Sequence, residues 1–431
     1  MAGVPVIQVL SRKNYEHQHL VPLPNALPLP PLSISSLRIK STILSLTTNN
    51  LTYARVGHLL GWWGVHPLPS SIPAEFSDPE QYGRISAWGY GVVIESNACD
   101  TNGSPIEVGT QVFGYLPIGT LPVDMQIQVS ASMDGQFVEV SKHRENVLPI
   151  YNRYRFYPPS VGSNKAEAKQ DLGFDALFRV LFETGYLMSR FVFAWEPGHL
   201  IHPSTMDDGW TSDDAKLGTN STVLMFSPSG KTALAFAYLL RHGRPTGTKP
   251  LTVIGIGSQS SHAFTEGTGL YDSVLDYDAD SRDGQNLGSV LSLPDDAKVV
   301  ILDFGSRGGA GDRWADALRK THKLVQLRVG GEVVADSPER ATQRFLASMQ
   351  SSAGLSRQLN ASVLRSQALD IMGSKRYFAE FEQEWDLCKK QGVVKGLRLI
   401  WGESMDDVGR GWERLCRGDV GPDEGLVFEL N

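Results

Sequence analysis

The chain has 431 residues, which is too long for one ordinary hydrophobic core and favours two domains or one large α/β domain with an appendage. Hydrophobic residues make up 41% of the sequence and charged residues 20%, as in ordinary globular enzymes. The formal net charge of −7 argues against a nucleic-acid-binding protein, because such proteins usually present a basic face.

Cysteine usage and the apolar runs indicate the compartment. Cys99, Cys388 and Cys416 are far apart and form no CxxC pair, which fits a reducing compartment. The longest apolar runs are shorter than the ~18 residues that a membrane span needs. The N-terminus lacks the pattern of a signal peptide. We therefore expect a soluble, cytoplasmic protein without a membrane partner.

The first part of the chain is predicted to be rich in strands. The proline-rich segment Pro22–Pro31 is typical of an extended arm, although an N-terminal strand followed by a surface linker is the favoured interpretation. After it, short strands alternate with Gly and Pro turns. The expected strands are Leu37–Leu46, Gly89–Ser96, Gln111–Tyr115 and Gln136–Val140. This pattern predicts a distorted β-barrel with little helix before residue 165.

After residue 165 the hydrophobic pattern changes from short strands to alternating strands and helices. Ala166–Ala194 has helical spacing, and Gly198–Lys216 is a polar segment that looks like an insertion. The strands expected after it are Thr222–Phe226, Leu251–Ile256, Ser273–Tyr277, Val299–Phe304 and Lys323–Val329, with helices at Thr232–Arg241, Ser260–Gly269 and Asp312–Arg319. Such an alternation predicts a doubly wound parallel sheet.

The C-terminal part ends on two helices and a strand. Tyr377–Gln391 and Met405–Arg417 are the predicted helices, and Gly425–Leu430 is a strand that returns to complete an earlier element. We predict a barrel domain over residues 1–165 that holds the substrate, a nucleotide-binding domain over 166–375, and a C-terminal segment over 376–431 that returns to the first domain.

The segment TVLMFSPSGKTALAFAYLL, Thr222–Leu240, is the most informative in the sequence. An apolar strand runs through a turn of small residues into a helix, whose first N–H groups and dipole suit a phosphate. Ala233 allows the helix to pack closely on the sheet. Only Gly230 of the three glycines of the dinucleotide fingerprint is present, so the motif by itself is weak.

Two other interpretations of this turn were weighed. Gly230-Lys231-Thr232 imitates the end of a P-loop, but the first glycine of that motif would fall at Met225, inside the strand. An NTPase is therefore disfavoured. The other alternative is a plain strand–helix turn that binds nothing, and the missing glycines support it.

The end of the second strand bears on the choice of nucleotide. An acidic residue there usually holds the ribose 2′-hydroxyl of NAD, and this strand ends instead in Gly257-Ser258-Gln259-Ser260. Ser258, Ser260 and His262 could face a 2′-phosphate, which slightly favours NADP. No Arg or Lys is present there to form a guanidinium clamp, and Lys231 is the nearest cation.

Other catalytic chemistries lack their motifs. The sequence has no HExxH motif and no Cys/His cluster, so we predict no metal site. It contains neither GxSxG nor the Tyr-x-x-x-Lys dyad of short-chain reductases. Aromatic and amide side chains remain as candidates that could polarise a carbonyl oxygen. Our catalytic candidates are Asn50, Tyr53, Trp88 and Tyr115, although aromatic residues of this kind also commonly fill a barrel core.

The order of these features resembles the medium-chain dehydrogenase/reductase superfamily, in its zinc-free quinone-oxidoreductase-like part. Trp88–Ser96 followed by VGTQVFG (Val108–Gly114) and then GQFVEV (Gly135–Val140) is similar to successive elements of its barrel. Asn49-Asn50-x-Thr52-Tyr53-Ala54, Trp88-Gly89-Tyr90, Tyr151-Asn152-Arg153-Tyr154 and Ser229-x-Lys231-Thr232-Ala233 resemble a branch of it known as a domain of unknown function. The likeness covers nearly the whole chain.

The resemblance implies an α/β fold in which a GroES-like barrel accompanies a Rossmann domain, with substrate and nicotinamide meeting in a cleft. It places nucleotide contacts at Ser227, Ser229, Gly230, Lys231, Thr232, Ala233, Gly257, Ser258, Asp303 and Gly330. The superfamily often pairs its nucleotide-domain sheets edge to edge, so a homodimer is expected.

We therefore expect an NADPH-dependent reductase of an activated C=C bond in a bulky apolar small molecule, such as an enone, a quinone or a polyketide-type intermediate. Tyr53, Asn50 or a water molecule would steady the developing enolate. Two alternatives stay open: a redox-silent cyclase or isomerase of specialised metabolism on the same fold, and a non-catalytic protein that only binds a small molecule.

Overall fold

A computed structural model describes residues 3–129, 135–157, 165–204, 209–279, 287–294, 296–331, 338–350, 356–392 and 394–430. The chain forms two compact units. Unit 1 comprises Met1–Val180, Val333–Arg344 and Arg398–Asn431, and unit 2 comprises Leu181–Glu332 and Phe345–Leu397. The predicted boundaries at residues 165 and 375 concern independently folding domains and stay predictions.

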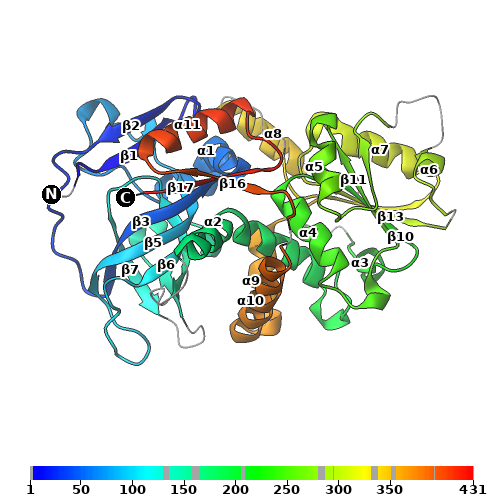
Figure 1. The fold of residues 1–431 in the computed structure, drawn as a ribbon, viewed down its shortest axis with the longest axis horizontal. Coiled ribbons are helices and arrows are strands. Elements are labelled where there is room, and N and C mark those ends of the chain that lie inside the picture. Colours follow the sequence, from blue (N-terminus) through cyan, green and yellow to red (C-terminus); the bar gives the residue numbers. More distant parts are fainter. Residues whose placement is uncertain are drawn as a thin grey trace. The chain divides into compact units, whose positions relative to one another are not determined.

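Unit 1 contains a closed β-barrel, drawn mainly in blue and cyan in Figure 1. Its strands are β3 (Ser36–Leu46), β5 (Ser86–Asn97), β6 (Gln111–Pro117), β9 (Arg153–Tyr157), β8 (Gln136–Glu139) and β7 (Val123–Val129), in that order. The pairing of β7 with β3 closes the barrel, with Ser36 opposite Gln126. The predicted barrel is therefore confirmed. Three of the predicted strands lie within these elements, and the fourth, Gln136–Val140, runs one residue past the end of β8.

Two further groups of strands extend unit 1. β17 (Glu424–Glu429) pairs antiparallel with β3, and β16 (Arg398–Gly402) pairs parallel with β17. The prediction that the last strand completes an earlier element is thus confirmed. β1 (Val6–Ser11), β2 (Gln18–Pro22) and β4 (Tyr82–Gly83) form a separate three-stranded sheet.

Helix α1 (Thr48–Leu60) corrects the expectation of little helix before residue 165. Short polar side chains such as those of Thr48, Asn49 and Asn50 often favour turns over helices. Here they start a helix instead. The Thr47 side chain accepts a hydrogen bond from the N–H of Asn49, and the Asn50 side chain accepts one from the N–H of Thr47 at 2.8 Å. This reciprocal cap satisfies amides that a helix start otherwise leaves unpaired.

The next two helices lie where the sequence predicts helices, and a third, over residues 338–350, was not predicted. α2 (Lys165–Leu187) begins in unit 1 and continues into unit 2, and α11 (Met405–Arg417) ends at Gly418 in a left-handed conformation. α8 (Pro338–Gln350) is shared in the same way. Within unit 1, Gly425 lets β17 approach α2, since a Cβ there would lie 2.1 Å from Leu177.

Unit 2 is built on a parallel six-stranded sheet, drawn mainly in green and yellow in Figure 1. In spatial order the strands are β12 (Ser273–Asp276), β11 (Thr252–Gly257), β10 (Ser221–Phe226), β13 (Lys298–Asp303), β14 (Lys323–Arg328) and β15 (Arg357–Gln358). Counted from β10, this is the 3-2-1-4-5-6 order of the Rossmann fold. The predicted doubly wound sheet is confirmed.

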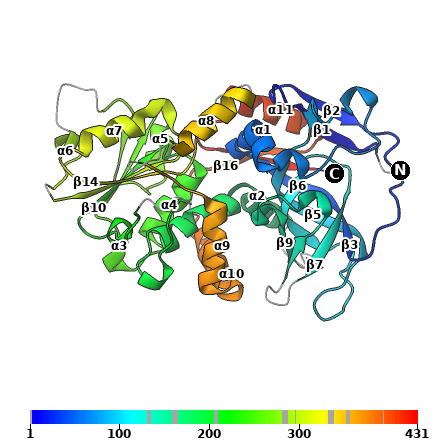
Figure 2. The ribbon, with the colours of Figure 1, turned by 180° about the vertical axis from the view of Figure 1, so that it is seen from behind.

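Helices cover both faces of this sheet. α4 (Lys231–Arg241) and α7 (Ala310–Leu318) lie on opposite faces, as Figure 2 shows from behind. On the α7 face, Trp314 and Leu318 pack with Phe226, Ile256 and Ile301 of the strands. The other helices of unit 2 are α3 (Ser212–Ala215), α5 (His262–Gly267), α6 (Leu287–Val290), α9 (Ala361–Met372) and α10 (Ser374–Lys390). Across the described part of the chain, no helix is both long and apolar enough to cross a membrane.

Candidate functional site

In the parallel sheet of unit 2, the strand order reverses between the neighbouring strands β10 and β13. β10 is followed by β11 on one side, whereas β13 and β14 extend the sheet on the other. The loops that leave β10 and β13 therefore diverge at their carboxyl ends. In open α/β sheets this divergence opens the crevice in which ligands bind.

The turn after β10 is held tightly. Ser227 has a φ of 58°, a left-handed conformation that non-glycine residues seldom adopt. Its N–H donates to the Ile256 carbonyl at 3.0 Å, and its hydroxyl lies 2.9 Å from that of Tyr277. The N–H of Gly230 closes the turn on the Ser227 carbonyl at 3.0 Å. The turn is therefore preformed.

Helix α4 begins at this turn without a side-chain cap. Gly230 occupies the N-cap position, and the first helical hydrogen bond runs from the N–H of Leu234 to the Gly230 carbonyl. The first amides of an α-helix make no hydrogen bond within the helix, so they can meet a ligand. A pyrophosphate fits such a start, because it accepts hydrogen bonds and carries the charge that the helix dipole favours.

Two glycines of β11 make room for the turn. A Cβ at Gly255 would lie 3.0 Å from the Cβ of Pro228, and one at Gly257 would lie 3.1 Å from its Cδ. The hydroxyl of Tyr271 also donates to the Pro228 carbonyl at 2.8 Å. Gly257 was predicted as a nucleotide contact, and the structure gives it this packing role as well.

Asp303 and Gly330 lie at the ends of β13 and β14. The Asp303 carboxylate is 4% exposed and accepts hydrogen bonds from the N–H groups of Gly305 and Ser306 at 3.1 and 2.7 Å. Desolvation raises its pKa above the ordinary value. A Cβ at Gly330 would lie 2.2 Å from the Phe304 carbonyl oxygen. Both residues shape the loop after β13, and their contact with a nucleotide stays a prediction.

The carboxyl end of β11 carries exposed hydroxyl groups. Ser258 and Ser260 lie 3.0 Å apart through their Oγ atoms at the start of α5. His262, the third residue predicted here, faces Asp276 instead, with 3.3 Å between Nε2 and Oδ1. The two serines are therefore the better placed to meet a polar group on a ribose.

Unit 1 brings three of the four catalytic candidates together. The rings of Tyr53 and Tyr115 have centroids 5.2 Å apart, and those of Trp88 and Tyr115 lie 5.3 Å apart. The Trp88 Nε1–H donates to the Tyr53 hydroxyl oxygen at 3.2 Å. Desolvation raises the pKa of Tyr53 above its ordinary value, so its hydroxyl stays protonated at neutral pH. Trp62 and Tyr151 complete this aromatic cluster.

Asn50, the fourth candidate, has its amide fully engaged. Its Oδ1 caps α1, and its Nδ2–H donates to the Ser86 carbonyl at 3.0 Å. The residue is 2% exposed. Asn50 thus anchors α1 to β5, and this fixes the helix that carries Tyr53.

A buried ion pair lies next to the aromatic cluster and is hydrogen-bonded to it through Tyr151. Arg144 is 0% exposed and pairs with Glu139 at 2.9 Å. Its Nη1–H groups also donate to the Tyr151 carbonyl at 3.2 Å and to the Tyr154 hydroxyl at 2.8 Å. Arg144 could not be recognised from the sequence, because its partners are brought together only when the barrel closes. Likewise, nothing in the sequence tied Tyr277 to Ser227.

A cluster of metal-ligating side chains was also sought among the described residues. Among the residues whose placement is described, no three His, Cys, Asp or Glu side chains gather in a way that could hold a metal ion. The expected absence of a metal site stays a prediction.

Several solved structures share this fold. CurA from Vibrio vulnificus in complex with NADPH matches with a TM-score of 0.53 and 13% identity, over 99% of each chain. The mitochondrial 2-enoyl thioester reductase heterodimer Etr1p/Etr2p from Candida tropicalis matches with a TM-score of 0.55 and 12% identity, over 99% of this chain and 100% of that one. The CurF ER cyclopropanase of the curacin A biosynthetic pathway matches with a TM-score of 0.55 and 13% identity, over 100% of both.

The chain thus shares the fold of these proteins, as the resemblance stated from the sequence implies. Residues 44–421 match the family described as protein of unknown function DUF2855, so the chain belongs to that family. No curated protein matches the sequence.

Proposed function

We propose that the protein binds NADPH at the carboxyl edge of the unit 2 sheet and reduces an activated C=C bond of a small apolar molecule. One observation carries the proposal: a Rossmann strand order with an uncapped helix start at its switch point. The structural relatives support it, since they include a protein in complex with NADPH and an enoyl thioester reductase.

The amides at the start of α4 would hold the pyrophosphate, together with the side chains of Ser227, Ser229, Lys231 and Thr232. Ala233 is fully buried against the sheet and lets the helix start come close to it. Ser258 and Ser260 would hold the 2′-phosphate through their hydroxyl groups. No acidic residue follows β11 directly, so the site lacks the group that favours NADH.

When bound, NADPH supplies a hydride to the β-carbon of the substrate. The chain's own contribution is to hold the carbonyl oxygen, on which negative charge develops. The Tyr53 hydroxyl suits this task, because it accepts a hydrogen bond from Trp88 and stays protonated at neutral pH. Trp88, which is partly exposed, would contact the substrate, while the buried Tyr115 and Asn50 would position Tyr53.

The experiment is a reduction assay with NADPH carrying deuterium at its transferable position and a panel of enones with bulky apolar groups. The proposal predicts consumption of NADPH and deuterium at the β-carbon of the product. The Tyr53→Phe variant should lose most of this activity. NADPH binding without deuterium transfer to any member of the panel would contradict the reductase assignment.

A redox-silent cyclase or isomerase is the second candidate. It is favoured by the thin glycine turn, in which Gly230 stands alone, and by the lack of a basic clamp after β11. A cyclopropanase occurs among the proteins of the same fold. In the assay above, conversion of substrate without net loss of NADPH would support this candidate over the reductase.

A further inference from the structure

A pocket lies in unit 2 at the amino edge of the parallel sheet. It has a volume of about 410 Å³, within the size range of small-molecule sites. Its walls come from residues 194–200, 212–217 and 244–248. The last two segments end four residues before β10 and β11 begin, at the amino ends of these strands. The pocket is therefore on the opposite edge from the start of α4.

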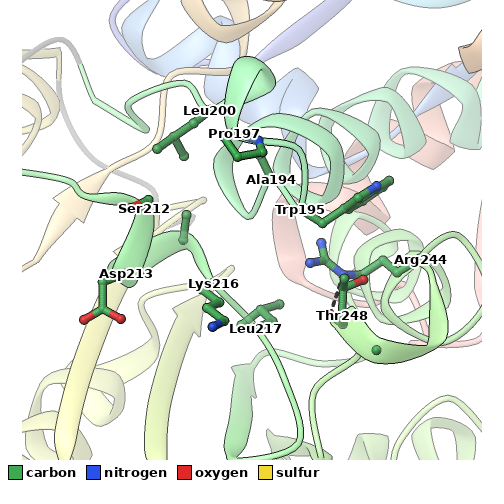
Figure 3. A pocket seen from close by; sticks show the side chains of 12 residues that line it. Ala194, Trp195, Pro197, Leu200, Ser212, Asp213, Lys216, Leu217, Arg244 and Thr248 are labelled. Atoms are coloured by element: carbon green, nitrogen blue, oxygen red, sulfur yellow. Dashed lines mark hydrogen bonds between the residues drawn. The ribbon is translucent and has the colours of Figure 1, made fainter.

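Arg244 forms one wall of this pocket, and its guanidinium end points toward the space between the labelled side chains in Figure 3. Three backbone carbonyls hold it. Nε–H donates to Thr248 at 3.0 Å, and Nη1–H groups donate to Ser189 and Phe193, both at 2.8 Å. Arg244 is 4% exposed, so the side chain is locked in one orientation.

The third nitrogen of this guanidinium, Nη2, is not used by these hydrogen bonds. Within the described ranges Nη2 donates no hydrogen bond, and no carboxylate pairs with Arg244. Arg244 lines the pocket, and Figure 3 draws its guanidinium end toward that space, which leaves Nη2 open to a ligand there. Burial and the nearby Arg190 lower the pKa of Arg244 to about 9. A buried cation without a counter-charge is costly, and a bound anion relieves that cost.

The charges near Arg244 are mixed: Arg190 pairs with Glu196 at 2.8 Å and with Glu380 at 3.6 Å, whereas Arg244 pairs with no carboxylate among the described residues. Both Arg190 and Arg244 lie over the ring of Trp195, at 4.7 and 4.8 Å from its centroid. Lys216 lines the pocket and is exposed. The carboxylate of the lining residue Asp213 is paired with Lys323, which leaves it little attraction for Arg244.

We propose that this pocket is a second ligand site, which binds a small organic carboxylate with an apolar body. The carboxylate would meet Nη2 of Arg244, a charge-assisted hydrogen bond in a partly dry setting. The apolar body would contact Ala194, Pro197, Leu200 and Leu217, which supply the apolar lining. The proposal does not depend on the proposed NADPH site, which lies at the other edge of the sheet.

The test uses the full-length protein with 3-phenylpropanoate as the probe and 3-phenylpropanamide as its neutral match. Calorimetry should detect the acid, with affinity falling as salt rises, and should find the amide at least about tenfold weaker. Hydrogen–deuterium exchange should slow in residues 194–200 and 212–217 and stay unchanged in 226–234. Equal binding of acid and amide, no binding of either, or slowing confined to other segments would overturn the proposal.

Two variants test which cationic side chains bind the carboxylate of the probe. Arg244→Gln should weaken the acid about tenfold or more and leave the amide unchanged. Because Arg244 also ties three carbonyls, its thermal melting must be compared with that of the native protein. Lys216→Gln changes an exposed side chain and keeps the fold, so it serves as the second variant. Lys216→Gln should weaken binding of the acid by a few fold. The site would be rejected if this variant bound the acid with unchanged affinity and the acid did not slow hydrogen–deuterium exchange in residues 194–200 and 212–217.

Discussion

The hydroxyl groups of Ser227 and Tyr277 lie 2.9 Å apart, and this contact joins the turn after β10 to the residue that follows β12. Ser227 adopts its left-handed conformation within this contact. The rings of Phe226 and Tyr277 also stack, with centroids 6.4 Å apart. Because the N–H of Ser227 also donates to Ile256 of β11, the proposed pyrophosphate turn is fixed from β11 and from the residue after β12 before any nucleotide arrives.

Reversing the charge at the start of α4 should weaken NADPH binding. Lys231→Glu places a carboxylate where the proposed pyrophosphate lies, and we expect the dissociation constant to rise about tenfold or more. Lys320→Glu makes the same charge change at an exposed position after α7, near the amino edge, and should leave it unchanged. Nicotinamide fluorescence titration measures both. Equal effects of the two variants would mean that the site is misplaced.

An acid after β11 should change the choice of cofactor. In Ser258→Asp the new carboxylate would repel a 2′-phosphate and accept a hydrogen bond from a ribose hydroxyl. We expect the ratio of NADH to NADPH affinity to rise about tenfold or more. Thr246→Asp, at an exposed position before β11, is the matched control. A ratio that stays constant in Ser258→Asp would place the ribose elsewhere.

Removing the Tyr53 hydroxyl should affect turnover but not cofactor binding. We expect Tyr53→Phe to lower kcat/KM for an enone by about 10²-fold, the usual loss of one donor to a developing oxyanion, with the NADPH dissociation constant unchanged. Tyr82→Phe, in the separate small sheet of unit 1, should retain full activity. Full turnover by Tyr53→Phe would remove this residue from the mechanism.

Breaking the buried ion pair should destabilise unit 1. Arg144→Met leaves Glu139 buried without its partner, and we expect the free energy of unfolding to fall by about 3–5 kcal/mol. Lys142→Met, two residues earlier and exposed, should change it by less than about 0.5 kcal/mol. Denaturant unfolding of both variants checks the prediction. Similar stabilities would show that the pair contributes little.

Lys298 should make stability depend on pH. Desolvation lowers its pKa from the ordinary 10.5 to about 8, so the folded protein loses this proton at lower pH than the unfolded chain does. Between these two values the unfolded chain binds more protons, and the contribution of Lys298 to the free energy of unfolding rises with pH. The stability difference between the native protein and Lys298→Met should therefore grow from about pH 8 to pH 10. A constant difference would contradict it.

The sequence predicted the sheet of unit 2 well, because β10 and β13 are continuous buried apolar runs bounded by polar turns. It did not predict α1, whose start depends on a reciprocal cap between Thr47 and Asn50 rather than on apolar spacing. The arrangement around Pro228 was also hidden, since it depends on two glycines of the neighbouring strand. Contacts between distant segments leave no periodic trace in a sequence.

For the same reason, the Arg244 pocket could not be foreseen. The segment Gly198–Lys216 was recognised only as a polar insertion, and its residues 205–208 lie outside the described part of the chain. The carbonyls that hold Arg244 come from Ser189, Phe193 and Thr248, which precede and follow the first strand of the sheet.

Titration of the purified protein with NADPH tests the central claim most directly. The account predicts saturable binding with a dissociation constant below about 1 mM, the upper end of the usual range for enzyme ligands, and weaker binding in Lys231→Glu. No change in nicotinamide fluorescence up to about that concentration would contradict it, and the turn after β10 would then be a plain strand–helix connection.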